Sequence, residues 1–325
     1  RSEKMELNLV DAINLGLSQE MERDNNVIIL GEDVGIDGGV FRVTDGLLKK
    51  FGKNRVFDTP LAESGIVGTA IGMAIYGLRP VAEIQFEGFT FPALDQLISH
   101  AAKMRNRSRG RFTCPMVVRS PIGGMVRALE HHSDSPETYF VHTPGLKVVI
   151  PSRPYDAKGL IVSAIRDPDP VIFFEPKRVY RAIREEVPEK DYTIPIGEAS
   201  VRVEGDDVTV ISWGAMVREC EKAISKTKAS VELIDLRSVK PLDVDAIIKS
   251  VKKTGRVVIV QEAQRTLGLA SEIIALINDK ALLSLEAPVE RITGFDTPVP
   301  LAKLEEYYSP SVERIAYGIE KVMKY

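Results

Sequence analysis

The sequence VIILGEDVG at residues 27–35 decides how the first half of the chain is interpreted. Four apolar residues are followed at once by an acidic turn between two glycines, a pattern that predicts a buried strand ending in a loop. Similar short apolar runs recur at 81–86, 116–118, 148–150 and 171–174. Buried strands separated by longer helical segments predict an α/β fold with a parallel sheet covered on both faces.

Helical segments are indicated between these runs. Asn8 is a suitable N-cap, and apolar residues recur every four positions behind it as far as Met21. Pro92 fits a first helical turn and precedes an apolar stripe that reaches Ala101.

The pattern breaks over residues 177–200, a charged stretch with two prolines that predicts a linker lying over a surface. Alternation then restarts, with strands expected at 208–212, 231–236 and 256–261 and helices near 215–227, 243–252, 268–279 and 311–323. We therefore expect two doubly wound α/β domains, residues 1–190 and 191–325, which agrees with a chain too long for one core.

Composition excludes several classes of protein. The 325 residues are 44% hydrophobic and 27% charged, which is typical of a globular chain, and the net charge of −3 gives no overall field for nucleic acid or an anionic membrane. No apolar run reaches the roughly 18 residues that span a bilayer. Cys114 and Cys220 are too few for a disulfide framework, which favours the cytoplasm or, in a eukaryote, the mitochondrial matrix.

Common catalytic and nucleotide-binding motifs are missing. The chain has no Gly-x-Gly-x-x-Gly, Cys-x-x-Cys, His-Glu-x-x-His or Gly-x-Ser-x-Gly, so dinucleotide, zinc and serine-hydrolase sites of the usual kinds are not indicated. Residues 46–53 differ from a phosphate loop in spacing. The alternating basic residues at 103–111 follow a helix, where cations complement the C-terminal dipole, and few aromatic residues lie between them. A solvated or intersubunit role is therefore favoured over nucleic-acid binding.

Two other stretches are candidates for a functional site. The loop at 31–35 follows a strand, where α/β sheets bind ligands, and a plain strand-to-helix loop is the alternative; the second stretch is FDTPLAESGIVG at 57–68. Gly- and Ala-rich residues continue to 74, and each glycine within a helix costs about 0.5–1 kcal/mol relative to alanine. Such residues are tolerated where another backbone comes close, so we expect this helix to pack against a second subunit. Glu63 would then be partly desolvated at the start of the helix, which makes it a candidate catalytic residue. The alternative is that Glu63 is only an acid placed favourably for the helix dipole.

The sequence EHHSDSPE at 130–137 places two histidines before an expected helix start, with Ser135 as N-cap and Pro136 in the first turn. The positive end of a helix disfavours imidazolium, and a neutral imidazole can accept or donate a proton near pH 7. Loop histidines bonded to the backbone are the alternative.

Together these segments resemble the beta subunit of the thiamine diphosphate-dependent, decarboxylating component of 2-oxo acid dehydrogenase complexes. The resemblance covers nearly the whole chain and runs through 31–35, 55–68, 77–86, 131–135, 144–151, 167–175, the linker, 208–214, 233–241 and 261–263.

The resemblance implies a transketolase-like arrangement, in which a pyrimidine-binding domain precedes a transketolase C-terminal domain. An alpha subunit would hold the diphosphate and Mg²⁺ through a Gly-Asp-Gly motif, which this chain lacks. The implied assembly has two alpha and two beta chains and transfers acyl groups to the lipoyl group of an acyltransferase core.

The resemblance also implies residue roles. Glu63 matches the glutamate that hydrogen-bonds N1′ of the aminopyrimidine, and Leu61, Gln85 and Phe89 match residues that line the pyrimidine ring. His132 matches the histidine that serves reductive acylation. Its neighbour His131 has a variable role in the family and is given a smaller part. In some members a potassium ion lies in a cage that maps to Met116, Ala164, Ile165, Asp167 and Asp169; a proline-stiffened turn without an ion is the alternative.

Two sequence patterns bear on substrate and partners. Residues 173–177 and 135–137 look closer to branched-chain members, whereas 85–86 and 159–167 are shared with bacterial pyruvate enzymes, so we expect a branched-chain 2-oxo acid, with pyruvate as the alternative. The segment EEYY at 305–308 is a candidate exposed docking surface; a plain connection into the last helix is the alternative. Rival interpretations are a fragment of a single-chain transketolase-type enzyme and a non-catalytic subunit that docks an alpha chain on the core.

Overall fold

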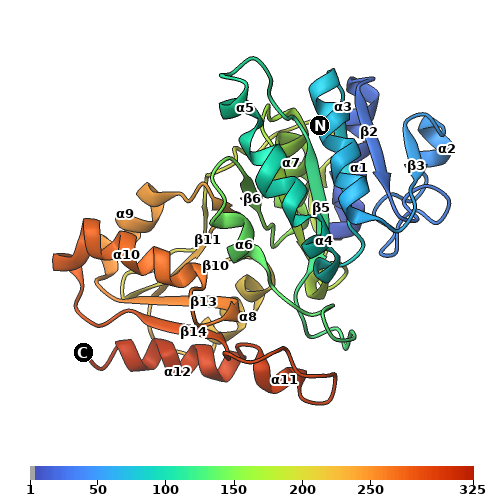
Figure 1. Cartoon of the computed structure of the whole chain (residues 1–325). Coiled ribbons are helices and arrows are strands. Elements are labelled where there is room, and N and C mark those ends of the chain that lie inside the picture. The colour runs from blue at the N-terminus through green and yellow to red at the C-terminus, as the bar shows by residue number, and fades with distance from the viewer. Residues whose placement is uncertain (1–3) are drawn as a thin grey trace. The chain divides into compact units, whose positions relative to one another are not determined.

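The computed structural model describes residues 4–325 and divides into two units (Figure 1). One unit comprises the chain up to Ile122 together with Tyr139–Ile196, and the other comprises Gly123–Thr138 with Gly197–Tyr325. The sequence placed one boundary near residue 190. In the structure the chain enters the second unit at Gly197, and the earlier segment 123–138 groups with that unit as well.

The first unit contains a parallel sheet, as expected. Its strands lie in the order β6 (Lys147–Val149), β7 (Val171–Pro176), β5 (Val117–Ile122), β4 (Arg79–Glu83), β2 (Val27–Gly31) and β3 (Val56–Asp58). Strands β2, β5 and β7 are buried throughout, because helices cover the faces of the sheet. These helices are α1 (Leu9–Arg23), α2 (Leu47–Phe51), α3 (Glu63–Tyr76) and α7 (Pro154–Arg166).

Helix α1 confirms the expected cap, since the Asn8 side chain accepts a hydrogen bond from the Asp11 amide at 2.9 Å. It packs along α7 at a close approach, where a Cβ on Gly16 would lie 2.6 Å from Ile161. The helix expected from Pro92 begins earlier, at Thr90, and is interrupted. It runs as α4 (Thr90–Asp95), a π turn (Gln96–His100), a 3₁₀ turn (Ala101–Lys103) and α5 (Met104–Arg107).

The linker prediction for residues 177–200 is wrong for part of that stretch. A 3₁₀ turn (Lys177–Val179) is followed by strand β8 (Glu185–Pro188), which pairs antiparallel with β1 (Lys4–Leu7). Val187 is fully buried and packs with Leu7 and Ala12. Neither strand is predicted by sequence, because both are short and carry charges at their exposed positions.

The second unit has its own sheet, in the order β14 (Glu290–Gly294), β13 (Val257–Gln264), β10 (Val208–Ser212), β11 (Val231–Asp235) and β9 (Ser200–Val203). The sheet is parallel except for β9, an antiparallel edge strand that the sequence analysis did not predict. Its other elements are α8 (Ala215–Ile224), β12 (Ser238–Lys240), α9 (Val244–Thr254), α10 (Leu269–Ala281), α11 (Glu305–Tyr308) and α12 (Val312–Val322). Helix α6 (Glu137–Val141) begins at the end of segment 123–138 and continues in the first unit from Tyr139. Within residues 4–325, no helix has the length and apolar character needed to cross a membrane.

Candidate active site

The carboxyl ends of β2, β3 and β4 meet at one edge of the first sheet, where parallel α/β sheets bind ligands. Asp58, which ends β3, accepts hydrogen bonds from the Gly35 amide at 2.6 Å and the Ile36 amide at 3.2 Å. Gln85, just after β4, donates from its side chain to Asp33 at 2.7 Å. These contacts join the expected 31–35 loop to both neighbouring strands.

Glu63 is the first residue of α3, and its side chain is buried, with 6% of the residue exposed. Within residues 4–325 its carboxyl group makes no hydrogen bond or ion pair, although the charge of Glu32 lies close enough to interact. Burial raises the pKa of Glu32, and the negative charge of Glu63 raises it further. A buried carboxyl group without a partner among the described residues is suited to bind a group supplied from outside them.

The predicted pyrimidine-lining residues differ in their surroundings. Leu61 is 73% exposed, whereas Gln85 and Phe89 are half-buried. Phe89 ends a 3₁₀ turn (Glu87–Phe89) and contacts Phe86 edge to face, with ring centroids 6.1 Å apart. The structure therefore brings Glu63 and Gln85 to the same 31–35 loop, with Phe89 on the turn that follows Gln85.

A buried ion network that the sequence analysis missed supports this edge of the sheet. Arg119 of β5 donates to Glu83 of β4 at 2.6 Å and to Glu175 of β7 at 2.6 and 2.9 Å. Tyr180 also donates to Glu175 at 2.6 Å. The signal was one buried charged residue in each of three otherwise largely apolar strands, but only the strand order shows that these residues meet.

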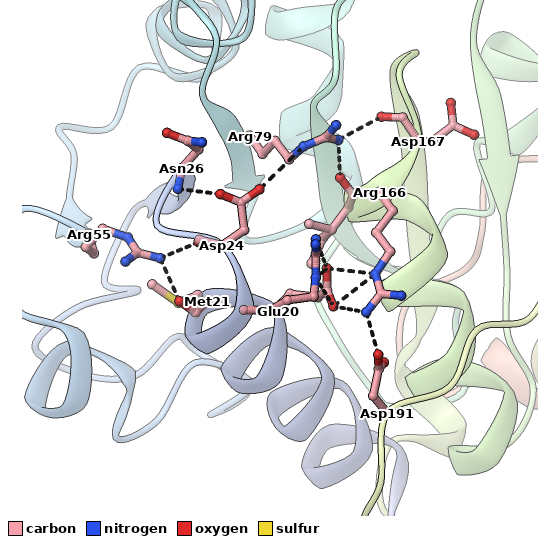
Figure 2. A network of polar contacts seen from close by, with 11 residues as sticks. Glu20, Met21, Asp24, Asn26, Arg55, Arg79, Arg166, Asp167 and Asp191 are labelled. Carbon is pink, nitrogen blue, oxygen red and sulfur yellow. Dashed lines mark hydrogen bonds and ion pairs between the residues drawn. The ribbon is translucent and has the colours of Figure 1, made fainter.

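Of the five predicted potassium ligands, Ala164 and Ile165 lie in the last turn of α7, Asp167 and Asp169 lie in the loop before β7, and Met116 directly precedes β5. Figure 2 shows Asp167 beside Arg79. The carbonyl oxygens of Ile165 and Asp167 both accept hydrogen bonds from the Arg79 guanidinium, at 2.7 and 3.3 Å. The Met116 carbonyl accepts from the Val171 amide at 3.0 Å, and the Ala164 carbonyl from the Asp167 amide at 3.3 Å.

Carboxylates of the same loop are also paired. Lys147 lies 2.6 Å from Asp167, and Arg105 lies 2.8 Å from Asp169. Residues 4–325 contain no group of three or more His, Cys, Asp or Glu side chains placed to hold a metal ion. A potassium ion would therefore share carbonyl oxygens with Arg79, and its presence stays a prediction.

The predicted histidine pair lies in segment 123–138 of the second unit. His131 is exposed and adopts a left-handed conformation with φ of 50°, and His132 is half-buried. The two rings meet edge to face with centroids 4.6 Å apart, and His132 Nδ1 lies 3.0 Å from the His131 carbonyl. The expected Ser135 cap is wrong: α6 begins at Glu137, and Ser135 Oγ is buried without a hydrogen-bond partner among residues 4–325.

Glu137 follows this pair and is 1% exposed. It accepts a hydrogen bond from Trp213 Nε1 at 3.2 Å, and its Oε2 atom has no hydrogen-bond partner within the described chain. Burial raises the pKa of the Glu137 carboxyl group to about 7.

This raised pKa predicts a pH-dependent stability. The contribution of Glu137 is fully present below its unfolded pKa of 4.5 and is lost as pH rises through about 7. We expect Glu137→Gln to flatten this decline, so that the variant gains stability relative to the unmodified chain between pH 5 and pH 8. Urea denaturation midpoints measured across that range test this, and parallel profiles for the two proteins would contradict it.

The expected docking surface at 305–308 is only partly exposed. Glu305 and Tyr308 are buried, with exposures of 3% and 4%, whereas Glu306 and Tyr307 face solvent. The prediction is wrong for the first two residues, because Glu305 binds backbone amides of segment 123–138, and Tyr308 packs against Gly294.

Comparison with known proteins assigns the family. The domain family described as "Transketolase, pyrimidine binding domain" matches residues 5–182, and "Transketolase, C-terminal domain" matches residues 197–315. The chain is 57% identical over 321 residues to "Pyruvate dehydrogenase E1 component subunit beta" of Acholeplasma laidlawii, covering 98% of each chain. It belongs to the 2-oxo acid dehydrogenase E1 beta subunits.

A second E1 beta subunit, that of pyruvate dehydrogenase from Bacillus subtilis, is 51% identical, over 98% of this chain and 99% of that protein. A solved structure titled "Split gene transketolase, inactive beta4 tetramer" matches with a TM-score of 0.80 and 19% identity, covering 98% of both chains. That likeness confirms the transketolase-like fold of this E1 beta subunit.

Proposed function

We propose that this E1 beta subunit forms, with an alpha subunit, a pyruvate dehydrogenase that decarboxylates pyruvate and transfers the acetyl group to a lipoyl group. The names of the similar proteins carry the choice of substrate. They do not support the branched-chain substrate favoured by the sequence patterns at 135–137 and 173–177.

Thiamine diphosphate would be shared between the two subunits, with the alpha chain holding the diphosphate and Mg²⁺. The cofactor supplies an electron sink for the loss of CO₂ from a 2-oxo acid. Glu63 fits this cofactor, since a buried carboxyl group without a partner within residues 4–325 can hold a proton at N1′ of the pyrimidine. Phe89 would stack on the ring, and Gln85 and Leu61 would complete its surroundings.

The surface of α3 supports the proposed alpha partner. Gly65, Thr69, Gly72 and Tyr76 follow one another at helical spacing and are all exposed, and Tyr76 is 90% exposed. A Cβ on Gly72 would meet nothing within 4 Å. A stripe of small residues ending in an exposed aromatic is suited to close packing against another chain, in keeping with a two-alpha, two-beta assembly.

Reconstitution with an alpha subunit tests the proposal. We expect tight binding of thiamine diphosphate and Mg²⁺ only by the assembled pair, and at least a tenfold higher kcat/KM for pyruvate than for 4-methyl-2-oxopentanoate. The opposite preference would restore the branched-chain assignment. A beta chain that assembles with the alpha chain and binds the acyltransferase core, but gives a pair that decarboxylates neither acid, would favour the interpretation as a non-catalytic subunit.

His132→Ala tests the proposed role in acyl transfer. We expect acetylation of a lipoyl domain to fall by about 10²–10⁴-fold, the usual contribution of a positioned acid–base group. Decarboxylation measured with a small artificial electron acceptor should stay within a few-fold, because that reaction needs no lipoyl group. His142→Ala, which changes an exposed histidine, is the control. Equal losses in both assays would contradict the assignment.

A further inference from the structure

The segment that carries His131 and His132 is a closed loop in an unusual backbone conformation. At its base the Gly123 amide donates to the Asp134 carbonyl at 2.8 Å. Between these ends Met125 and Arg127 adopt left-handed conformations, with φ of 64° and 57°. Residues with side chains rarely adopt such angles, and they persist where the surroundings hold them.

Two buried carboxylates of the second unit hold this loop by its backbone. Glu305 of α11 accepts from the amide of Met125 through one oxygen and from the amide of Arg127, at 3.0 Å, through the other. Glu262 of β13 accepts from the Gly124 amide at 2.7 Å. Both left-handed residues therefore donate to one side chain, which is 3% exposed. In Figure 1 the loop is green and lies beside the red segment that contains α11.

The loop fits these carboxylates closely. A Cβ on Gly123 would lie 2.9 Å from Glu262 Oε2, and a Cβ on Gly124 would lie 2.9 Å from Glu305 Oε1. Two successive glycines thus leave room for two carboxylates, and an alanine at Gly124 would push against Glu305. The arrangement also forms a pocket, with residues 128–131, 133 and 134 on one side and 298–301, which lead into α11, on the other.

We infer that Glu305 is a positioning residue for acyl transfer, acting through the loop backbone to orient the His132 imidazole. Glu262 holds the same loop at the neighbouring amide, that of Gly124. The inference rests on the proposed function of His132. Charge-assisted hydrogen bonds from two amides to one carboxylate are stronger than neutral ones, so Glu305 stabilises the left-handed conformations at Met125 and Arg127. Without it the backbone relaxes, and the imidazole leaves the place where it serves the reaction.

The test uses the reconstituted alpha–beta assembly with Glu305→Ala and Glu305→Gln. We expect lipoyl-domain acetylation to fall at least tenfold through kcat, while decarboxylation with the artificial acceptor stays within about twofold. Glu320→Ala removes the same charge from an exposed position of α12 and should change neither rate. Gly124→Ala should reproduce the effect of Glu305→Ala, because it disturbs the same contact from the loop side.

A double-mutant cycle separates this inference from the function on which it rests. If Glu305 acts through His132, adding Glu305→Ala to His132→Ala lowers acetylation no further. Normal acetylation by Glu305→Ala, or additive losses in the cycle, would overturn the positioning role and leave His132 in place. Normal acetylation by His132→Ala itself would instead overturn the proposed function.

A readout independent of activity guards against variants that assemble poorly. Arg127 is exposed, so trypsin cleavage after it reports loosening of the loop. We expect cleavage at least tenfold faster in the assembled Glu305→Gln and Gly124→Ala variants than in Glu320→Ala. An unchanged cleavage rate in both variants would show that Glu305 does not hold the loop.

Discussion

Glu63→Gln should abolish most decarboxylation by the assembled enzyme, with a loss of about 10²–10⁴-fold, while the alpha and beta chains still assemble. The amide has the size of the carboxyl group but cannot take up or release the proton proposed to be held at N1′. Steady-state decarboxylation of pyruvate with an artificial acceptor measures the loss, and calorimetric titration with thiamine diphosphate and Mg²⁺ shows whether binding survives.

Glu313→Gln is the matched control, because Glu313 also lies in the first turn of a helix but is exposed to solvent. It should leave activity unchanged. A Glu63→Gln enzyme that works at a near-normal rate would remove Glu63 from the catalytic machinery. Loss of assembly instead of activity would show that the carboxyl group serves the subunit contact.

Arg119→Met should lower the free energy of unfolding by about 3–5 kcal/mol, the usual cost of leaving buried charges without their partner. Arg119 is 1% exposed, and its removal leaves the buried carboxylates of Glu83 and Glu175 without the cation that pairs with both. Urea denaturation at a fixed protein concentration measures the change.

Two further variants test the cause. Replacing both acids as well, in Arg119→Met with Glu83→Gln and Glu175→Gln, should restore part of the lost stability, since no uncompensated charge remains. Arg105→Met breaks a pair with Asp169 in which the Arg105 side chain is 48% exposed, and solvent screens such a pair, so the free energy of unfolding should change little. Equal costs for Arg119→Met and Arg105→Met would contradict the network's importance.

Sequence patterns predicted most of the central strands and long helices, because buried parallel strands are continuous apolar runs and covering helices show an apolar stripe. They failed where tertiary contacts override local preference. Strand β8 has a charged exterior and forms only through pairing with β1. Ser135 has the chemistry of a cap but makes no capping bond, and α6 begins two residues later.

The sequence by itself determined the two α/β units, the family resemblance and the candidates Glu63 and His132, since each depends on residue type and order along the chain. Only the tertiary structure decided which distant side chains meet. It brought Arg119 between two acids of neighbouring strands and buried Glu305 against the amides of the histidine loop. The physical reason is that strand order and loop closure join residues as much as 180 positions apart, and no local pattern records those contacts.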